Sequence, residues 1–301
     1  MANTTLVDEL EEQQITYYNS WGIIISVNSW LAFTVNVLHL VILTQLKTLT
    51  KKPYRHILIH ITLGDMFTSL TTSIYYTFLS YFFLPSVNEY SVPYGFKYLA
   101  STGLVFFPLF TCYWIFVFAS IEQYYAICQP MKYETSSYIK KLPWILWAGW
   151  LMTFLMVYGF LFLIQEYSFS LQSYQRNMSM GHIIFKLVPL LITIIFLIPI
   201  LKELRKMAGD QIPAGREQAR NAAIYLIIIF SIFSMYSLFD IAVSLSTMVI
   251  KLDFTFLLLE RIRNMIKTWY AILNTIIYGW RTKTYRQYIR DRLQCHSNGG
   301  V

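Results

Sequence analysis

The chain of 301 residues is poor in charged residues, and what it lacks excludes several classes of protein. Charged residues make up 13% of the chain, whereas an ordinary soluble domain has about 25%. This leaves too little polar surface for a nucleic-acid-binding module. Three cysteines exclude a disulfide-rich secreted domain, and 12 glycines and 9 prolines exclude a collagen-like chain. The chain is instead 56% hydrophobic, which excludes disorder and indicates an integral membrane protein.

The sequence also lacks the motifs of common catalytic sites. It contains no His-Glu-x-x-His motif, no paired cysteines, no Gly-x-Ser-x-Gly motif and no phosphate-binding loop, and its five histidines are scattered. We therefore expect no enzymatic activity, no metal site and no cofactor. An intramembrane enzyme that uses charged residues alone is a minor alternative.

Seven apolar stretches approach or exceed the length of about 20 residues that a helix needs to cross the hydrocarbon core. They are residues 21–46, 57–84, 98–121, 144–164, 182–201, 221–248 and 254–280. The first six are clear, and charges interrupt the seventh. Continuous apolar runs are typical of helices, whereas a transmembrane barrel needs shorter alternating segments. We therefore expect an all-α, seven-transmembrane helix bundle at 21–280, an extracellular segment at 1–20 and a cytoplasmic tail at 281–301.

Basic residues predict how the bundle is oriented. Seventeen of the 24 Lys and Arg lie in segments 47–55, 132–141, 202–220 and 281–292, which share one side of a seven-helix bundle. Basic residues favour the cytoplasmic side, so the carboxyl end is expected inside and the acidic amino end outside, at the plasma membrane. Acceptor triplets for N-glycosylation begin at Asn3 and Asn177, both on the expected outer side.

One ionisable residue lies in the middle of the second predicted span. An ionised side chain at the centre of a spanning helix costs about 2.5–3.5 kcal/mol on insertion scales, so Asp65 needs a partner or a function. It is either a carboxyl group held by hydrogen bonds to Asn36 or Asn274, or an ion or proton site that responds to activation. Both interpretations place Asp65 inside the bundle.

The outer half of the seventh span carries a polar stripe. Glu260, Arg263, Asn264 and Lys267 have the i, i+3, i+4, i+7 spacing of one helix face, which should point into the bundle. Two further charged residues, Lys186 and Asp240, are candidates for the same cavity. The stripe forms either internal ion pairs, with Glu260 on Arg263 and Asp240 on a neighbouring base, or a pocket with net positive charge for a carboxylate or another anion.

Aromatic residues crowd the outer end of the second span. They are Tyr75, Tyr76, Phe78, Tyr81, Phe82 and Phe83. Such a group is typical of the aromatic belt at a membrane interface, and we expect this role for most of them. Lining of a ligand pocket is the alternative.

Two segments resemble those of a known family of membrane proteins. Residues 120–133 read SIEQYYAICQPMKY, similar to the acidic-Arg-Tyr motif and the following AIC-x-P-x-x-Y loop of rhodopsin-like G-protein-coupled receptors, especially olfactory receptors. Residues 273–283 read LNTIIYGWRTK and resemble the NPxxY box of that family and its odorant-receptor continuation. Landmark residues of the first, second, fourth and fifth helices are matched by Asn36, Asp65, a Trp at 147 or 150, and Pro189.

The tail also resembles that family. Residues 282–293 are similar to its short amphipathic eighth helix, with Tyr285 at the usual aromatic position. Cys295 then suits a palmitoyl anchor, with a plain free thiol as the alternative.

The resemblance implies an odorant-type receptor at the cell surface, embedded in membrane lipids, that binds a small extracellular ligand and signals through a heterotrimeric G protein. The candidate ligand-binding residues are Lys186, Asp240, Glu260, Arg263, Asn264 and Lys267. The candidate residues for activation and G-protein coupling are Asp65, Glu122, Gln123, Tyr124, Asn274 and Tyr278.

The chain also departs from the pattern of the family. Gln123 replaces the usual Arg, which leaves Glu122 protonated or held by another donor, and Thr275 replaces the Pro of the last box. The usual extracellular disulfide is missing, and a cysteine, Cys112, stands where a sodium-binding hydroxyl is expected beside Asp65. Two alternatives stay open. Gln123 and the missing disulfide favour a receptor-like protein that binds ligand without coupling to a G protein. The charges within the spans allow a channel or transporter, against which the absence of visible repeats counts.

Overall fold

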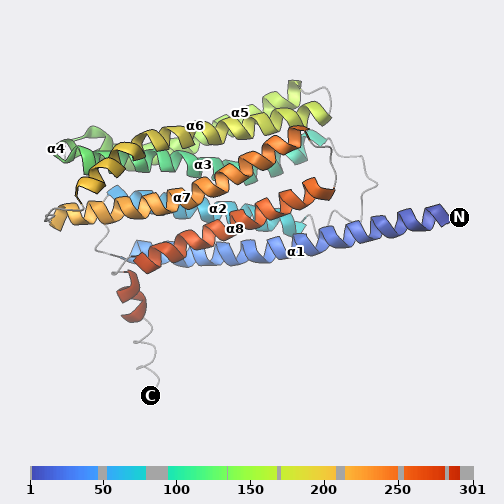
Figure 1. Cartoon of the computed structure of the whole chain (residues 1–301), viewed down its shortest axis with the longest axis horizontal. Helices are drawn as coiled ribbons and strands as arrows, with labels where there is room; N and C mark the ends of the chain where they lie inside the picture. The colour runs from blue at the N-terminus through green and yellow to red at the C-terminus, as the bar shows by residue number, and fades with distance from the viewer. Residues whose placement is uncertain are drawn as a thin grey trace, which may run out of the picture.

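The computed structural model describes residues 2–46, 53–78, 94–133, 135–167, 171–207, 214–249, 254–281 and 285–291, and within these ranges the chain is almost entirely helical. The helices are α1 (Ala2–Gln45), α2 (Pro53–Phe78), α3 (Tyr94–Cys128), α4 (Pro130–Tyr133), α5 (Ser137–Tyr167), α6 (Leu171–Lys206), α7 (Ala214–Val249), α8 (Phe254–Arg281) and a short helix at 285–291. The long helices lie lengthwise beside one another (Figure 1). The all-α prediction is confirmed for this part of the chain.

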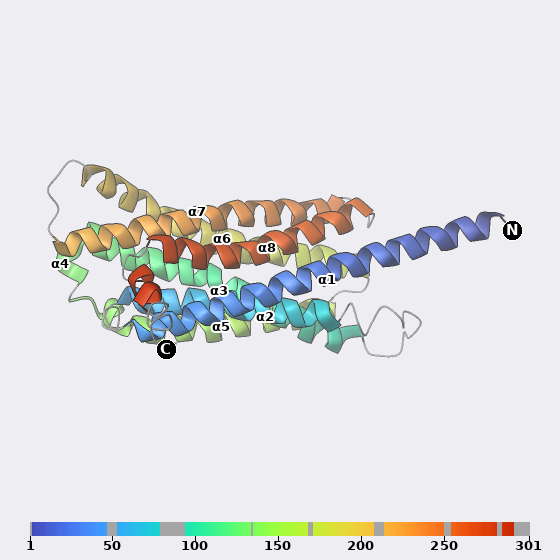
Figure 2. The same cartoon turned by 90° about the horizontal axis from the view of Figure 1, so that it is seen from below.

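The third long helix lies at the centre of the assembly. It packs against α2, α5, α6 and α7, whereas α8 packs against α1, α2 and α7. Figure 2 shows α1 continuing beyond the other helices toward the amino terminus. This helix has no break at the predicted boundary near residue 20, because it runs from Ala2 to Gln45.

Six helices have the length and apolar composition to cross a membrane, which is the pattern of a multi-pass membrane protein. The segments are Ser20–Gln45, Tyr54–Thr77, Gly103–Cys128, Ser137–Ile164, Arg176–Lys206 and Ala219–Ser246. They correspond to the first six predicted spans. The predicted seventh, α8, is 28 residues long and is not among the six, since its first half carries Glu260, Arg261, Arg263 and Lys267.

Polar groups within the apolar helices are satisfied locally. The hydroxyls of Thr72, Thr111 and Thr153 each donate to the backbone carbonyl four residues earlier, at 2.6, 2.9 and 2.8 Å. Helices α3 and α6 also contain prolines, Pro108 and Pro189 among them. Membrane helices tolerate proline because hydroxyls and neighbouring helices satisfy the freed carbonyls. The Thr193 hydroxyl also donates to the carbonyl four residues earlier, that of Pro189, at 2.9 Å.

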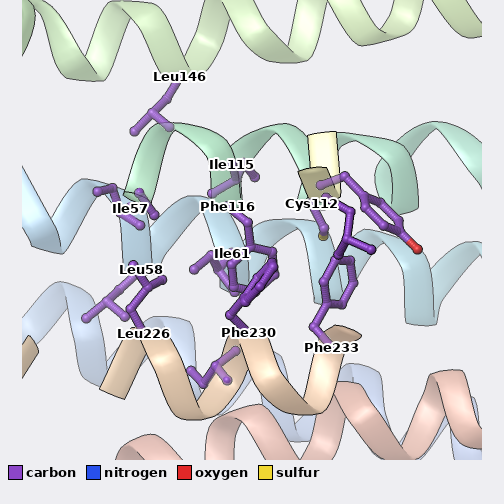
Figure 3. Close-up of a cluster of buried hydrophobic side chains, with 14 of the residues drawn as sticks. Ile57, Leu58, Ile61, Cys112, Ile115, Phe116, Leu146, Leu226, Phe230 and Phe233 are labelled. Atoms are coloured by element: carbon purple, nitrogen blue, oxygen red, sulfur yellow. The ribbon is translucent and has the colours of Figure 1, made fainter. Parts of the chain in front are cut away.

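Aromatic side chains join the central helix to α7 (Figure 3). The ring of Phe116 stacks on that of Phe233 with centroids 4.7 Å apart, and Tyr113 lies 4.5 Å from the same ring. The Tyr113 hydroxyl donates to Ser237 Oγ at 2.8 Å. This contact combines close aromatic packing with a buried hydrogen bond, so α7 is firmly placed against α3.

The second and third helices meet closely at Gly64. A Cβ atom added there would collide with the sulfur of Cys112, and both residues are buried. We expect Gly64→Ala to lower the free energy of unfolding by about 1 kcal/mol, the low end for overpacking, because the colliding atom ends a side chain. Thermal unfolding of the purified protein measures this. Cys112→Ala removes the sulfur that the new methyl group would meet, so adding Gly64→Ala to Cys112→Ala should cost little stability. If Gly64→Ala cost as much in the Cys112→Ala background as in the wild type, the steric explanation would be wrong.

A short helix closes the structure near the carboxyl end of α8. The helix expected at 282–293 is present over 285–291. Its Tyr285 is buried, and the hydroxyl lies 3.0 Å from His39 Nδ1 of α1, while Tyr288 donates to Gln45 Oε1. Burial raises the pKa of Tyr285 to about 12, so this phenol stays protonated at neutral pH. The two bonds hold the short helix against α1.

Candidate functional site

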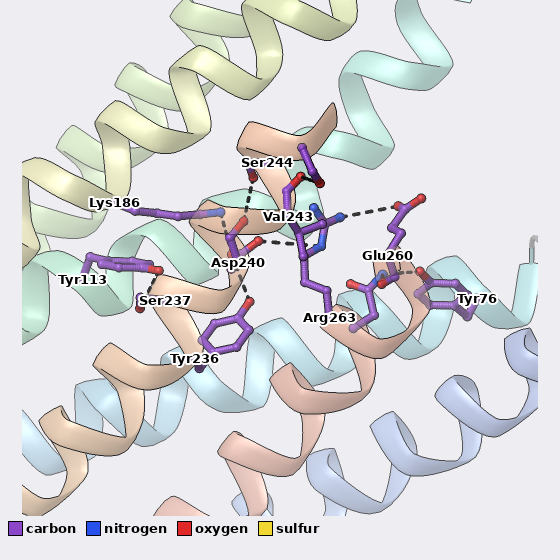
Figure 4. Close-up of polar contacts among 12 residues, drawn as sticks. Tyr76, Tyr113, Lys186, Tyr236, Ser237, Asp240, Val243, Ser244, Glu260 and Arg263 are labelled. Carbon is purple, nitrogen blue, oxygen red and sulfur yellow. Dashed lines mark hydrogen bonds and ion pairs between the residues drawn. The ribbon is translucent and has the colours of Figure 1, made fainter. Parts of the chain in front are cut away.

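A buried group of charged residues joins three helices at one end of the bundle (Figure 4). Lys186 Nζ of α6 lies 2.5 Å from Asp240 Oδ2 of α7, and Arg263 Nε of α8 lies 3.7 Å from Asp240 Oδ1. Tyr236 also donates its hydroxyl to Asp240 Oδ2 at 3.3 Å. Lys186 is only 1% exposed. One carboxylate therefore holds two cations from different helices.

The polar stripe of α8 continues this group toward the start of that helix. Arg263 Nη2 lies 3.5 Å from Glu260 Oε1. Asn264 Nδ2 donates to Tyr76 Oη of α2 at 2.6 Å and to the Glu260 carbonyl at 3.0 Å. The predicted face is thus confirmed, since the stripe points toward other helices. We call Tyr76, Lys186, Asp240, Glu260, Arg263, Asn264 and Lys267 the outer cluster.

The ion pairs expected from the sequence are present, yet they leave one cation over. Glu260 pairs with Arg263, and the base beside Asp240 is Lys186. Lys267 is 5% exposed and makes no hydrogen bond or ion pair with any residue that the structure describes. Three basic side chains, Lys186, Arg263 and Lys267, thus face two acidic ones, Asp240 and Glu260, and basic residues are in excess. Internal pairing and an excess of basic side chains therefore exist together.

The aromatic-belt interpretation is wrong for Tyr76. This side chain is 4% exposed, its hydroxyl is bonded to Asn264, and the Arg261 guanidinium lies 5.1 Å from the centre of its ring. A residue of an interfacial belt would face lipid and headgroups. Tyr76 instead faces α8 because it lies on the inner side of its helix. Tyr81, Phe82, Phe83 and the side chain of Phe78 lie outside the described residues.

Two residues of this region were missed from the sequence. His182 is buried against Phe106 and Phe110, with ring centroids 4.0 and 5.6 Å away. Tyr236 supplies the hydrogen bond to Asp240. A signal for His182 was available, since it precedes Lys186 by four residues and so shares its helix face. The same signal was available for Tyr236, which precedes Asp240 by four residues.

A second polar group lies between α2, α7 and α8. Asn274 Nδ2 donates to Asp65 Oδ2 at 2.6 Å, and Tyr225 donates its hydroxyl to Asn274 Oδ1 at 3.2 Å. Of the two expected partners of Asp65, Asn274 is therefore the one observed. Asn36 instead accepts a hydrogen bond from Thr275 at 3.1 Å and donates to the Ala271 carbonyl at 3.3 Å. The side chains of Asp65, Tyr225 and Asn274 are all buried, so each of these hydrogen bonds contributes to the packing of the helices.

The acidic residue near the carboxyl-terminal end of α3, Glu122, has two donors. Gln123 Nε2 donates to Glu122 Oε2 at 2.5 Å, and Tyr133 of α4 donates its hydroxyl to Glu122 Oε1 at 2.6 Å. Another donor thus replaces the expected arginine. Tyr124 accepts a hydrogen bond from Gln129 at 3.0 Å and packs on Phe196 of α6.

The next candidate residue, Tyr278, is buried where α8 ends. Its ring lies 5.1 Å from that of His39, 5.3 Å from Tyr225 and 5.4 Å from Tyr285. The short helix and α8 therefore share an aromatic contact.

Tyr133 is the most exposed of the three residues Glu122, Gln123 and Tyr133, and its hydrogen bond can be tested alone. Burial, followed by the charge of Glu122, raises the pKa of the Tyr133 phenol well above its usual range, so it remains a donor at neutral pH. Tyr133→Phe keeps the ring and removes that bond. We expect a loss of about 1.5 kcal/mol in the free energy of unfolding, as for a hydrogen bond to a charged group. Thermal unfolding measures it, and Tyr138→Phe, whose hydroxyl bonds only a backbone carbonyl, is the matched control. Equal losses would contradict a charged acceptor.

The remaining predicted residues fall as follows. Trp150, not Trp147, is the buried tryptophan of α5, and its Nε1 donates to His60 at 3.0 Å. Cys112 and Cys128 are both free thiols. Asn177 is half-buried within α6, and the side chain of Asn3 and all of Cys295 lie outside the described residues. In the described ranges no group of three or more His, Cys, Asp or Glu could hold a metal ion.

The fold and the buried polar groups together define the class of the protein as a helical, multi-pass membrane protein with charged residues in its interior. No family model matches the chain, and no curated protein matches it. The function therefore rests on the residues themselves.

Proposed function

We propose that the chain is a cell-surface receptor of the rhodopsin-like type, closest to odorant receptors, that binds a small extracellular ligand and signals through a heterotrimeric G protein. One observation carries the proposal. One bundle holds the buried outer cluster, on α2, α6, α7 and α8, and the Glu122–Gln123–Tyr133 group, on α3 and α4, with the Asp65–Asn274 bond joining α2 to α8. Ligand recognition and coupling need such separate, connected sites.

The proposal makes α8 the seventh span. Its charged stripe is turned inward, with Lys267 and Asn264 buried and Arg263 paired. Its opposite face is apolar and exposed, through Trp269, Leu273 and Ile276. An amphipathic helix of this kind suits a bundle in lipid, since its charges meet other helices and its apolar face meets lipid tails.

Signalling then follows from the ion pairs. The outer cluster joins α6, α7 and α8, so a ligand that binds there changes the contacts that hold these helices together. It shifts the equilibrium toward the state for which it has higher affinity. In that state the inner ends of α6 and α7 move apart, and the G protein docks against the basic segment 202–220 and against Glu122, Gln123 and Tyr124.

The orientation and the modifications belong to the same proposal. The amino terminus lies outside the plasma membrane and the carboxyl terminus inside, with an N-linked glycan on Asn3 and a palmitoyl anchor on Cys295. The basic segments on one side of the seven predicted spans support this orientation.

The experiment that tests the proposal is second-messenger output in cells. Wild type and Gln123→Arg are compared at matched surface expression, with and without a panel of odorants and small carboxylates. A wild-type response supports coupling and makes Gln123 a tolerated variant. A response from Gln123→Arg alone would support the second candidate, a receptor-like protein that binds ligand without coupling. That candidate is favoured by the neutral Gln123, which cannot form the charged fork of an arginine.

A further inference from the structure

The strongest unexplained feature of the bundle is the ammonium group of Lys267. It lies one helical turn deeper along α8 than Arg263, on the same face, and is within electrostatic reach of Asp240. The side chain is 5% exposed and has no hydrogen-bond or ion-pair partner among the described residues. A buried charge without a partner is costly in a bilayer and marks a functional position.

The carboxylates nearby are already occupied. Asp240 binds Lys186 with one oxygen and Arg263 with the other, and Tyr236 adds a third bond. Glu260 is turned toward Arg263 and is more than a third exposed at its side chain. Asp240 and Glu260 are therefore engaged by other cations, and Lys267 has no ion pair with any residue that the structure describes. A negatively charged ligand group would supply one.

A second buried donor lies one turn deeper on the same helix. The hydroxyl of Tyr270 is buried and has no hydrogen-bond partner in the described part of the chain. Its ring packs with Phe233 and Tyr236 of α7, at 5.2 and 6.3 Å between centroids. Successive turns of α8 thus present a cation, an unpaired hydroxyl and an aromatic surface.

We infer that the ligand of the proposed receptor is a small monocarboxylate with an apolar body, whose carboxylate binds the ammonium of Lys267 and whose body packs on the aromatic rings beside it. That the ligand acts through a receptor rests on the proposed function, whereas the binding of the carboxylate to Lys267 does not. A single carboxylate matches the one ammonium group that has no ion pair among the described residues. A neutral odorant would leave Lys267 without a counter-charge.

The test compares acids with neutral compounds of the same shape. Hexanoate and benzoate are added to the full-length protein in lipid nanodiscs, beside hexanamide and benzamide. Binding to the folded state raises the Tm, and its dependence on concentration gives a Kd. We expect both carboxylates to raise the Tm and both amides to leave it unchanged.

Variants locate the binding site. Lys267→Met keeps the length of the side chain and removes its charge, and we expect the Kd for the carboxylates to rise by about 30-fold or more. Lys267→Arg keeps the charge and should still bind. Lys141→Met, at an exposed lysine at the start of α5, is the control and should leave the Kd unchanged. Lys267→Gln replaces the methionine variant if that variant does not fold, and the comparison of acid with amide needs no variant.

Several results would overturn the inference. They are equal Tm shifts from acid and amide, no shift from either acid, or an unchanged Kd in Lys267→Met. Covalent trapping of hexanal on Lys267 by borohydride, with no binding of the acids, would also overturn it in favour of an imine. Binding that depends on Lys267 without any second-messenger output would leave the inference standing and remove the proposed coupling. Second-messenger output in response to neutral odorants alone would overturn the inference and leave the proposed coupling standing.

Discussion

Asp240→Asn is expected to lower the free energy of unfolding by about 3–5 kcal/mol, the range for breaking a buried ion pair by removing one partner. Asparagine has the same shape as aspartate and can still accept the hydrogen bond of Tyr236, so little packing is lost. What is lost is the charge that compensates Lys186, which is 1% exposed, and Arg263. Thermal and denaturant unfolding of the purified protein measure the effect.

A surface pair provides the control for this prediction. Lys206 and Glu203 of α6 lie 3.1 Å apart, but their side chains are 74% and 34% exposed. Glu203→Gln should therefore cost no more than about 1 kcal/mol. The double variant Lys186→Met/Asp240→Asn removes the unpaired ammonium and should recover most of the lost stability. If the double variant were less stable than Asp240→Asn, the buried ion pair would not be the cause.

The sequence predicts the inward face of α8 because charge spacing and helix geometry are both local. The i, i+3, i+4, i+7 positions of Glu260, Arg263, Asn264 and Lys267 determine one face whatever the helix packs against. The residue of another helix that pairs with a charged side chain cannot be found from such local spacing. Asp240 meets Lys186, 54 positions earlier in the chain, because α6 packs beside α7. Helix crossing depends on how all side chains pack together, which spacing within one helix does not reveal.

The two sites also show where composition misleads. A run of aromatic residues in α2 predicts a membrane belt, yet Tyr76 faces inward and binds Asn264, because rotation about the helix axis decides which ring meets lipid. At the inner end, the donors of Glu122 are its neighbour Gln123 and Tyr133, from the turn after α3. The sequence shows Gln123 where the resemblance implies an arginine. The replacement by Tyr133 depends on how the chain turns at Pro130 and was not predictable from the motif.

Asn274→Ala is expected to lower the free energy of unfolding by about 2–3 kcal/mol, from two interhelical hydrogen bonds that in membranes contribute up to about 1–2 kcal/mol each. The amide donates to Asp65 of α2 and accepts from Tyr225 of α7, so a single side chain of α8 connects three helices. Unfolding of the purified protein measures the loss.

The neighbouring residue tests whether this effect is specific to Asn274. Thr275 is half-buried and makes one interhelical bond, to Asn36 at 3.1 Å, so Thr275→Ala should cost about 0.6 kcal/mol, the average for such bonds. The double variant Asp65→Ala/Asn274→Ala should cost less than the sum of the two single variants, because both remove the same bond. Strict additivity would mean that the Asp65–Asn274 bond contributes nothing. The helices that Asn274 connects, α2, α7 and α8, are also those that carry Tyr76, Asp240 and Arg263 of the outer cluster. The proposed receptor would therefore transmit a change in the outer ion pairs through helices that Asn274 holds together.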